Sequence, residues 1–441
     1  MRRILLCTLA AVSLLASCRK YDDHVFDKSP DQRINEALAQ YQSAIAGATD
    51  GWNGSITTGD GSYFRFYFRF NNDNRVVMFS DFSNETAGTA RESSYRLKQL
   101  QQPALIFDTY SYLHILADPD GGVNGGVYGR GRVSDFEFAI DTVTTDSINL
   151  TGRFNGTKMK LKKATAQDRA GWENKSITNA ITALRDLSKI LQYFRRMNYN
   201  GTQYELQLDT FAKKAVISWI DGSGQAVSVE RGYYFVPGGI AFTAPIINGS
   251  ATITGFTIVS FNNGTLVMNV TVNGTAATIA GANGPINPDK TAWQRWWNVG
   301  LNTGQYWITV DGFHVNGVDD AYGMKTLKTD TSEYYYTLYW PGVNPNNDAF
   351  APIYLNPSKN AVELYYGVGH RATGLTDGRV RFTDLGPLNT PTPYPATGPA
   401  ADMRNQMRNT SGYWFVQTSP TSFDMVSAAD AKIWLTWYYI F

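Results

Sequence analysis

The sequence contains very little cysteine: Cys7 and Cys18 are the only two in 441 residues. Cys7 lies inside an apolar N-terminal segment of the kind that is removed from secreted proteins, and Cys18 follows that segment directly. A chain that loses Cys7 in this way keeps one cysteine, so it can form no internal disulfide. We therefore expect its stability to come from packed cores, which a chain of this length can supply.

The sequence also lacks a strong net charge. Its formal net charge is +1, and it falls to −1 without residues 1–17, which carry Arg2 and Arg3. Proteins that bind nucleic acids usually present a basic patch, and no basic run interleaved with aromatic residues occurs here. We expect no nucleic-acid partner.

Common catalytic motifs are missing as well. The four histidines, His24, His114, His314 and His370, form no His-Glu-x-x-His motif and no pair at metal-ligand spacing. There is no Gly-x-Ser-x-Gly elbow and no Gly-x-x-x-x-Gly-Lys phosphate loop. A hydrolase would need a site assembled from distant segments, so we expect a protein that is not an enzyme.

The most informative segment that is present is the N-terminus. Arg2 and Arg3 precede an apolar run, Ile4–Leu15, that is too short to span a bilayer. The run ends in Leu15-Ala16-Ser17-Cys18, which resembles the lipobox of bacterial lipoproteins. The resemblance implies cleavage before Cys18 and acylation of its thiol; the alternative is an ordinary signal peptide followed by a chance cysteine.

The residues after Cys18 are polar and predict a tether. Extended, they would reach about 40 Å from the membrane before the first expected helix. The stretch Lys20-Tyr21-Asp22-Asp23 resembles the acidic export signal of surface lipoproteins in Bacteroidota, although a solvated linker would have the same charge pattern.

A helix and a series of strands follow. Ser29 and Pro30 suit a helix start, and Ile34, Leu38, Tyr41 and Ile45 share one face. In residues 63–70 four phenylalanines alternate with tyrosine and arginine, which predicts a strand that is buried on one face. About eight short runs of this kind predict an antiparallel meander.

The pattern then repeats. Residues 175–195 are expected to form a second helix, and a second series of strands follows it. Asn-Gly pairs, which favour two-residue hairpin turns, recur along the chain. Among them are the pairs that begin at Asn53, Asn155, Asn200, Asn248, Asn263, Asn273 and Asn316. A Trp-rich helix at 289–301 opens a third series of strands that ends the chain.

These patterns predict a mainly β protein. It has two helix-plus-antiparallel-meander units, which form lipocalin-like barrels or curled sheets, and a C-terminal β-sandwich-like domain. The expected divisions are residues 1–17 (signal peptide), 18–30 (lipidated Cys18 and tether), 31–168 (first unit), 169–288 (second unit) and 289–441 (C-terminal domain).

Specific strings in the first third of the chain resemble a family of Bacteroidota lipoproteins whose domain has no known function. They are Lys20–Asp23, Val25–Lys28, Arg33–Leu38, Asn74–Met78, Ser94–Leu97, Leu105–His114, Leu116–Asp120 and Ser134–Phe138. Such families tend to be encoded beside starch-utilisation-type uptake systems of the outer membrane. The resemblance implies an accessory role in nutrient uptake and supplies no catalytic residues.

Two sets of residues are candidate binding sites. Asp118, Asp120 and Asn124 offer oxygen ligands that could hold Ca²⁺, although their loop departs from the EF-hand pattern and a solvated Gly-rich hairpin loop is the alternative. No other cofactor is expected. Farther on, Tyr334, Tyr336, Tyr339 and Trp340 adjoin a Pro-Gly-Asn loop. Such rings can stack on sugars, and core packing is the alternative.

Together these features predict a non-catalytic, lipid-anchored protein of the outer membrane, exposed at the cell surface. Its expected partners are the membrane, an outer-membrane uptake complex, and an oligosaccharide or peptide nutrient. The alternatives are an assembly partner of the transporter that binds no nutrient and a hydrolase with a dispersed site.

Overall fold

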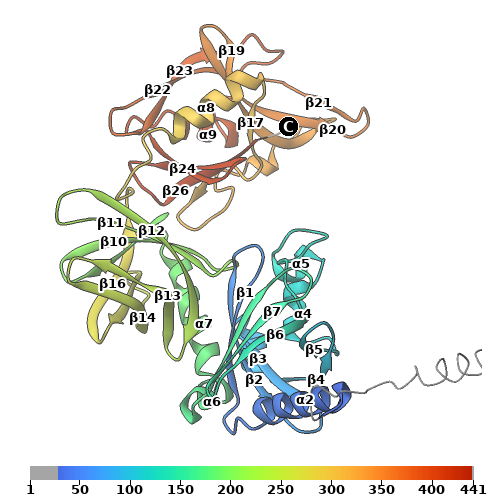
Figure 1. Ribbon diagram of the computed structural model, residues 1–441. Coiled ribbons are helices and arrows are strands. Elements are labelled where there is room, and N and C mark those ends of the chain that lie inside the picture. Colours follow the sequence, from blue (N-terminus) through green and yellow to red (C-terminus); the bar gives the residue numbers. More distant parts are fainter. Residues whose placement is uncertain (1–27, 440–441) are drawn as a thin grey trace, which may run out of the picture.

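The computed structural model describes residues 28–439, so Cys18 and most of the expected tether lie outside the described residues. The chain is mainly β and forms three β units in succession, each accompanied by helices (Figure 1). This confirms the expected fold class. Within residues 28–439, no helix combines the length and the apolar character needed to cross a membrane.

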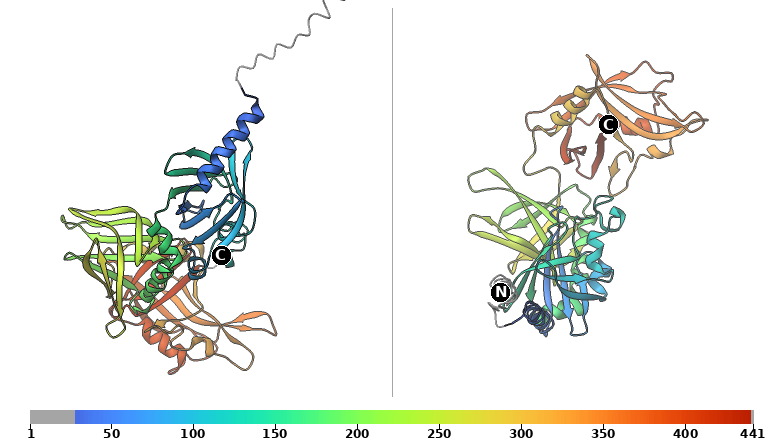
Figure 2. Two further views of the ribbon diagram at one scale, coloured as in Figure 1. Left: turned by 90° about the horizontal axis from the view of Figure 1, so that it is seen from below. Right: turned by 45° about the vertical axis from the view of Figure 1, so that its right-hand side comes forward.

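The first unit begins with α2 (Pro30–Ala46), which lies on the outside of the first barrel (Figure 2). Ser29 caps the helix as expected, because its Oγ accepts a hydrogen bond from the Gln32 N–H at 3.2 Å. The expected apolar face is also confirmed: it ends at Ile45, which is buried, and the Ile45 carbonyl accepts a hydrogen bond from Trp52 Nε1 at 2.8 Å. These contacts fasten α2 to the first strand.

The first barrel is a closed antiparallel meander of eight strands, in which β8 pairs back onto β1. Three short helices interrupt it: α3 (Asn84–Gly88), α4 (Tyr112–Ala117) and α5 (Gly121–Asn124). The strands are β1 (Trp52–Thr57), β2 (Tyr63–Phe70), β3 (Arg75–Ser80), β4 (Arg91–Gln99), β5 (Pro103–Phe107), β6 (Glu137–Val143), β7 (Ser147–Gly152) and β8 (Lys158–Lys163).

The second barrel repeats this plan. The helices α6 (Ala166–Glu173) and α7 (Ser176–Arg185) and the 3-10 turn η1 (Asp186–Lys189) precede eight closed antiparallel strands. They are β9 (Phe194–Tyr199), β10 (Thr202–Asp209), β11 (Lys214–Ile220), β12 (Ala226–Val236), β13 (Gly239–Asn248), β14 (Ala251–Asn262), β15 (Val267–Val272) and β16 (Thr275–Ala282).

The helix expected over residues 175–195 is too long at its C-terminal end. Phe194 begins β9, which pairs with both β10 and β16. Although the apolar residues here recur at helical spacing, pairing with these two strands makes the segment a strand. The division expected at residue 168 also falls inside α6. The sequence of α6 has few apolar residues to reveal it.

The third unit contains α8 (Ala292–Thr303), η2 (Met324–Thr326), α9 (Pro399–Met407) and one antiparallel sheet. We expected a sandwich-like arrangement; here the sheet curls until β17 and β26 pair with each other. Its strands are β17 (Trp307–Thr309), β18 (His314–Val315), β19 (Glu333–Asn344), β20 (Asn347–Asn356), β21 (Ala361–Glu363), β22 (Val368–Gly374), β23 (Val380–Pro387), β24 (Tyr413–Ser419), β25 (Ser422–Ser427) and β26 (Ile433–Tyr439).

Side chains fill the interiors of the sheets. In the first barrel Phe64, Phe66 and Phe68 are fully buried, and the rings of Phe66 and Phe68 stack with centroids 5.4 Å apart. In the third unit Trp296 of α8 occupies the centre of an aromatic core. Because side chains fill these interiors, the spaces between the units are the places for a ligand.

The first two barrels share a hydrophobic core. Tyr67 and Phe79 lie on the outer face of the first barrel, yet both are buried in the same cluster as Trp172 and Ile177 of α6 and α7. Asn84 Nδ2 adds a hydrogen bond to Thr182 Oγ1 at 3.1 Å. The position of α7 between the two barrels is visible in Figure 1.

Candidate functional site

A cavity of 630 Å³ lies between the first and second barrels. This volume is within the range of about 300–1,000 Å³ that is typical of small-molecule sites. We call it the barrel 1–2 cavity. Its walls come from the loop after β3, from α5 and its C-cap, from the end of α7 and from the β10–β11 turn with β12. The lining residues are Phe82, Ser83, Gly121–Gly125, Ile181, Leu184, Arg185, Thr210, Phe211, Lys213 and Phe235.

The β10–β11 turn places a lysine inside this cavity. Asp209 Oδ1 accepts hydrogen bonds from the backbone N–H groups of Phe211 and Ala212 at 2.9 and 2.8 Å, which folds the turn. The chain then passes through Lys213 with φ at +54°, a left-handed conformation that is uncommon for lysine. The Lys213 carbonyl accepts a hydrogen bond from the Tyr233 N–H at 2.8 Å, which fixes this conformation.

The Lys213 side chain is buried but makes few polar contacts. The residue is 3% exposed, and its Nζ lies 4.4 Å from the centre of the Phe235 ring. Within the described part of the chain, its ammonium group has no hydrogen bond and no ion pair at contact distance. A buried ammonium group that faces a cavity without an acceptor is a candidate ligand-binding group.

Asp81 provides the nearest compensating charge from the first barrel. It is fully buried, and its Oδ1 accepts a hydrogen bond from the Arg65 N–H at 2.9 Å. Its Oδ2 accepts one from the Phe235 N–H at 3.3 Å, across the junction between the barrels. Both carboxylate oxygens are therefore engaged with backbone.

Burial dominates the electrostatics of this pair. It raises the pKa of Asp81, against the opposing effects of the Lys213 charge and of the backbone hydrogen bonds from Arg65 and Phe235. Burial likewise lowers the pKa of Lys213; Asp81 and Asp209 oppose this shift, and Arg185 adds to it. Perturbed groups that line a cavity are typical of functional sites.

A second buried cation lies behind the α5 wall. Arg132 Nε donates to the Asn124 carbonyl at 2.9 Å, and Nη1 donates to Asp60 Oδ2 at 3.1 Å. Its Nη2 is buried and has no hydrogen-bond partner among the described residues. Gly125, with φ at +68°, separates this nitrogen from the cavity: a Cβ at that position would lie 2.9 Å from Nη2 and 3.1 Å from Phe211 Cδ1.

The structure brings the expected calcium ligands together in one turn beside the cavity. Asp118 Oδ2 accepts a hydrogen bond from Tyr110 at 2.7 Å, and Asp120 Oδ1 accepts one from the Gly122 N–H at 2.8 Å. The Asn124 oxygen accepts one from the Gly126 N–H at 2.8 Å. Across residues 28–439, no group of three acidic, histidine or cysteine side chains is arranged to hold a metal. Calcium binding stays a prediction.

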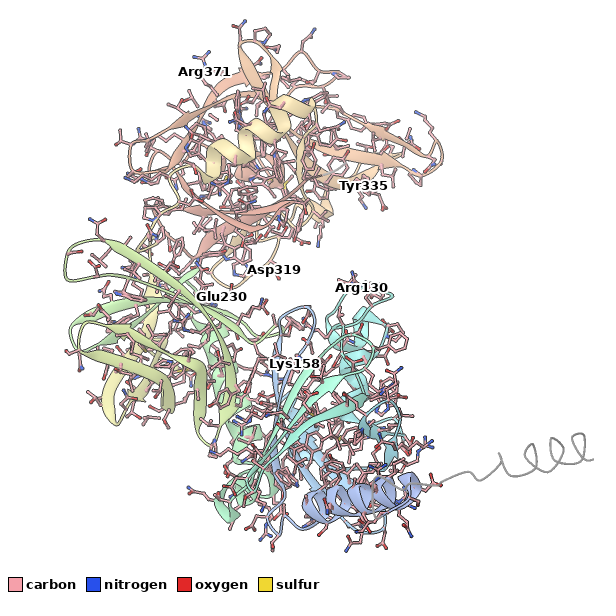
Figure 3. The ribbon with its side chains drawn as sticks, viewed as in Figure 1. Arg130, Lys158, Glu230, Asp319, Tyr335 and Arg371 are labelled. Atoms are coloured by element: carbon pink, nitrogen blue, oxygen red, sulfur yellow. The ribbon has the colours of Figure 1, made fainter. Side chains whose placement is uncertain are left out.

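The four expected aromatic residues do not share one surface. Tyr339 is fully buried, and its hydroxyl donates to Asp348 at 2.7 Å inside the third unit, where Tyr334 also packs. Tyr336 and Trp340 point outward and pack with Tyr306 in a separate apolar cluster. The more exposed ring is their neighbour Tyr335, at the surface of the third unit (Figure 3).

A further cavity of 560 Å³ lies between the second and third units, but its charged groups have partners. Arg195 Nε donates to the Leu187 carbonyl at 3.0 Å, and His314 Nδ1 is 2.6 Å from Asp319 Oδ1. Tyr193 donates to Asp424 Oδ2 at 2.6 Å. We therefore regard the barrel 1–2 cavity as the candidate site.

No pattern in the sequence singles out Lys213 or Asp81. A lysine in a hairpin turn and an aspartate after a strand are usually solvated. The one available signal was the Gly-rich loop after Asp118, which we interpreted as a metal loop and which forms a wall of the cavity.

The fold and the cavity thus define a mainly β protein of successive barrels with a candidate small-molecule site between the first two. Comparison with protein families matches residues 22–260 to a domain of unknown function, DUF4302. The match covers more than half of the chain, which therefore belongs to this family. No curated protein matches the chain.

Solved structures give only weak likenesses. A DNA polymerase III subunit beta sliding clamp from Bartonella birtlesii bound to griselimycin is 8% identical and has a TM-score of 0.17, with 92% of this chain and 97% of that chain covered. The Helicobacter pylori beta clamp bound to a DNA ligase peptide is 8% identical with a TM-score of 0.12, and the coverage is 93% and 98%. Scores this low give no basis for a shared fold or function.

Proposed function

We propose that this protein is a lipid-anchored accessory component of an outer-membrane nutrient-uptake system in Bacteroidota. It is exposed at the cell surface and binds a small nutrient, derived from a glycan or a peptide, without chemical conversion. The barrel 1–2 cavity is the binding site.

The observation that carries this proposal is the sequence Leu15-Ala16-Ser17-Cys18 at the end of a short, positively flanked apolar run. An acylated Cys18 would fix the N-terminus in the membrane, and the polar residues after it would hold α2 and the barrels clear of the headgroups. A single acyl chain binds weakly, but a lipoprotein cysteine carries more than one, which supports stable anchoring.

The cavity supports the binding part of the proposal. It has the volume of a small-molecule site, its walls are largely apolar, and it contains a buried ammonium group that has no hydrogen-bonding partner within residues 28–439. The interiors of the barrels, in contrast, are filled by side chains such as Phe66 and Trp296.

Metabolic labelling with a fatty-acid analogue tests the anchor. The wild-type chain should be labelled and should sediment with outer membranes. A Cys18→Ala variant should be unlabelled and should leave the membrane fraction. Unlabelled wild-type protein, or membrane attachment that survives the substitution, would refute anchoring.

Arrays of glycans and peptides test binding, with a mature chain that carries Cys18→Ser. Specific signals on either array support a binding component. Flat arrays combined with co-purification of a transporter from native membranes would instead indicate an assembly role. Turnover of the bound compounds would indicate an enzyme.

A further inference from the structure

The barrel 1–2 cavity contains a buried ammonium group that makes no direct polar contact with the described residues. The ammonium group of Lys213 has no acceptor among the described residues, whereas Arg185, which also lines the cavity, is exposed to solvent. Asp81 and Asp209, the nearest acids, use carboxylate oxygens to accept backbone N–H groups. A ligand with a negative charge would supply the missing acceptor.

Arg132 is a second buried cation, behind the wall of the cavity. Its side chain is 6% exposed, and two of its nitrogens have partners, while Nη2 has none in the part of the chain that the structure describes. This nitrogen lies behind Gly125 and beside the Phe211 ring, and Asp60, 3.1 Å from Nη1, compensates the charge of the guanidinium group. Lys213 is therefore the buried cation that lines the cavity itself.

The walls limit the rest of the ligand. Phe82, Phe211 and Phe235 contribute aromatic rings, and Ile181 and Leu184 of α7 contribute aliphatic side chains. Such walls suit a ligand with an apolar body and offer few hydrogen-bonding partners to a hydroxyl-rich sugar. The one ammonium group without a direct partner among the described residues matches a ligand with one negative charge.

We propose that the barrel 1–2 cavity binds an organic monocarboxylate with an apolar body, and that the Lys213 ammonium group pairs with its carboxylate. The inference rests on the part of the proposed function that makes this cavity a binding site; a peptide carboxylate agrees with the nutrient named there, and a fatty acid would replace it. A peptide that ends in an apolar residue and a fatty acid are two sources of this chemistry. The ligand carboxylate lies at Lys213, and its apolar body lies against Phe211 and Phe235.

Calorimetric titration of the full mature chain with defined probes tests this. N-acetylphenylalanine represents the peptide carboxylate, octanoate represents the fatty acid, and N-acetylphenylalaninamide is the matched neutral control. We expect one of the two acids to bind, and N-acetylphenylalaninamide to bind at least about tenfold more weakly than N-acetylphenylalanine if the peptide source is correct. Glucuronate, a carboxylate without an apolar body, should bind more weakly than the acid that binds.

Two substitutions isolate the charge. Lys213→Met should weaken binding of the acid by about tenfold or more. Lys214→Met is the control, because Lys214 is the next residue and its Nζ lies 3.6 Å from Glu230 Oε1 instead of lining the cavity. If Lys213→Met fails to fold, Lys213→Met combined with Asp81→Asn removes both buried charges and gives the same comparison.

Each outcome decides the inference. Equal affinity for the acid and its amide, unchanged affinity in the Lys213 variants, or no binding of any probe would overturn it. If the Lys213→Met variant still binds the arrays as the wild type does, this inference alone is overturned and the proposed function stands. Absence of the fatty-acid label from the wild-type chain would refute the anchor and would not affect the inference about the chemical class of the ligand.

Discussion

Asp81 of the first barrel accepts a hydrogen bond from the backbone N–H of Phe235 in the second barrel, at 3.3 Å. The bond lies at a junction that also contains Tyr67, Trp172 and a shared apolar core. A buried carboxylate in this position links the two barrels and fixes the wall of the cavity between them.

Replacement of Asp81 should destabilise this junction. Asp81→Leu removes the acceptor for two backbone N–H groups and leaves the Lys213 ammonium group without its nearest carboxylate, so we expect a loss of about 3–5 kcal/mol in the free energy of unfolding. Urea denaturation measures it. Asp73→Leu, in the exposed β2–β3 turn, should change the free energy by less than about 1 kcal/mol. Equal losses in the two variants would contradict the role of the Asp81 carboxylate.

His370 should make the third unit sensitive to acid. Burial lowers the pKa of His370 to about 4 from 6.5, and neither ring nitrogen has a partner among the described residues. Between these values the unfolded chain binds more protons than the folded chain, so stability falls as the pH falls from 6.5 toward 4. The loss should reach about 3 kcal/mol at the lower limit.

Unfolding measured across this pH range, with His370→Leu for comparison, tests the prediction. The variant keeps an apolar contact with Phe350 and should lose most of the acid dependence. His314→Gln, which alters a histidine outside the core of the third unit, should retain the acid dependence. An unchanged pH profile in His370→Leu would show that another group is responsible.

Asp135 and Glu137 should differ in importance although they are close in sequence. Asp135 is 3% exposed and accepts hydrogen bonds from the N–H groups of Phe154, Asn155 and Thr157 at 2.8–3.1 Å. Asp135→Ala should therefore cost about 2–4 kcal/mol, because buried donors lose a charged acceptor. Glu137→Ala, a partly exposed position, should cost less than about 1 kcal/mol. Thermal unfolding of the two variants distinguishes them.

Much of the fold was predictable because local patterns agreed with tertiary packing. The alternation in residues 63–70 gave the buried phenylalanines of β2, and Asn200 and Asn273 have the positive φ that an Asn-Gly hairpin turn requires. Asn53-Gly54 is an exception: both residues lie within β1. Whether a meander closes depends on pairing between its first and last strands, as between β17 and β26, and no local pattern encodes that.

The candidate site was largely beyond sequence reasoning. Lys213 is in a hairpin turn, and it lines a cavity together with Phe82 and Phe235, which are distant in sequence and come from different barrels. Tyr67 illustrates the same limit, since the alternation placed it on a solvent face that the second barrel covers. Contacts between domains decide both environments, and periodicity describes only single elements.

Gly125 and Gly129 provide a matched pair that tests the geometry of the cavity wall. Both have a positive φ, +68° and +83°, so alanine should cost each position about 1–2 kcal/mol through backbone strain alone. At Gly129 nothing lies within 4 Å of an added Cβ, whereas at Gly125 the Cβ would meet Arg132 Nη2 and the Phe211 ring.

Gly125→Ala should therefore destabilise the chain more than Gly129→Ala and should also weaken binding of the monocarboxylate probe, because Arg132 or Phe211 must move. Gly129→Ala should bind the probe like the wild type. Denaturation curves and probe titrations on both variants measure the two effects separately. Equal binding by the two variants would mean that the α5 wall does not contact the ligand, even where Lys213 does.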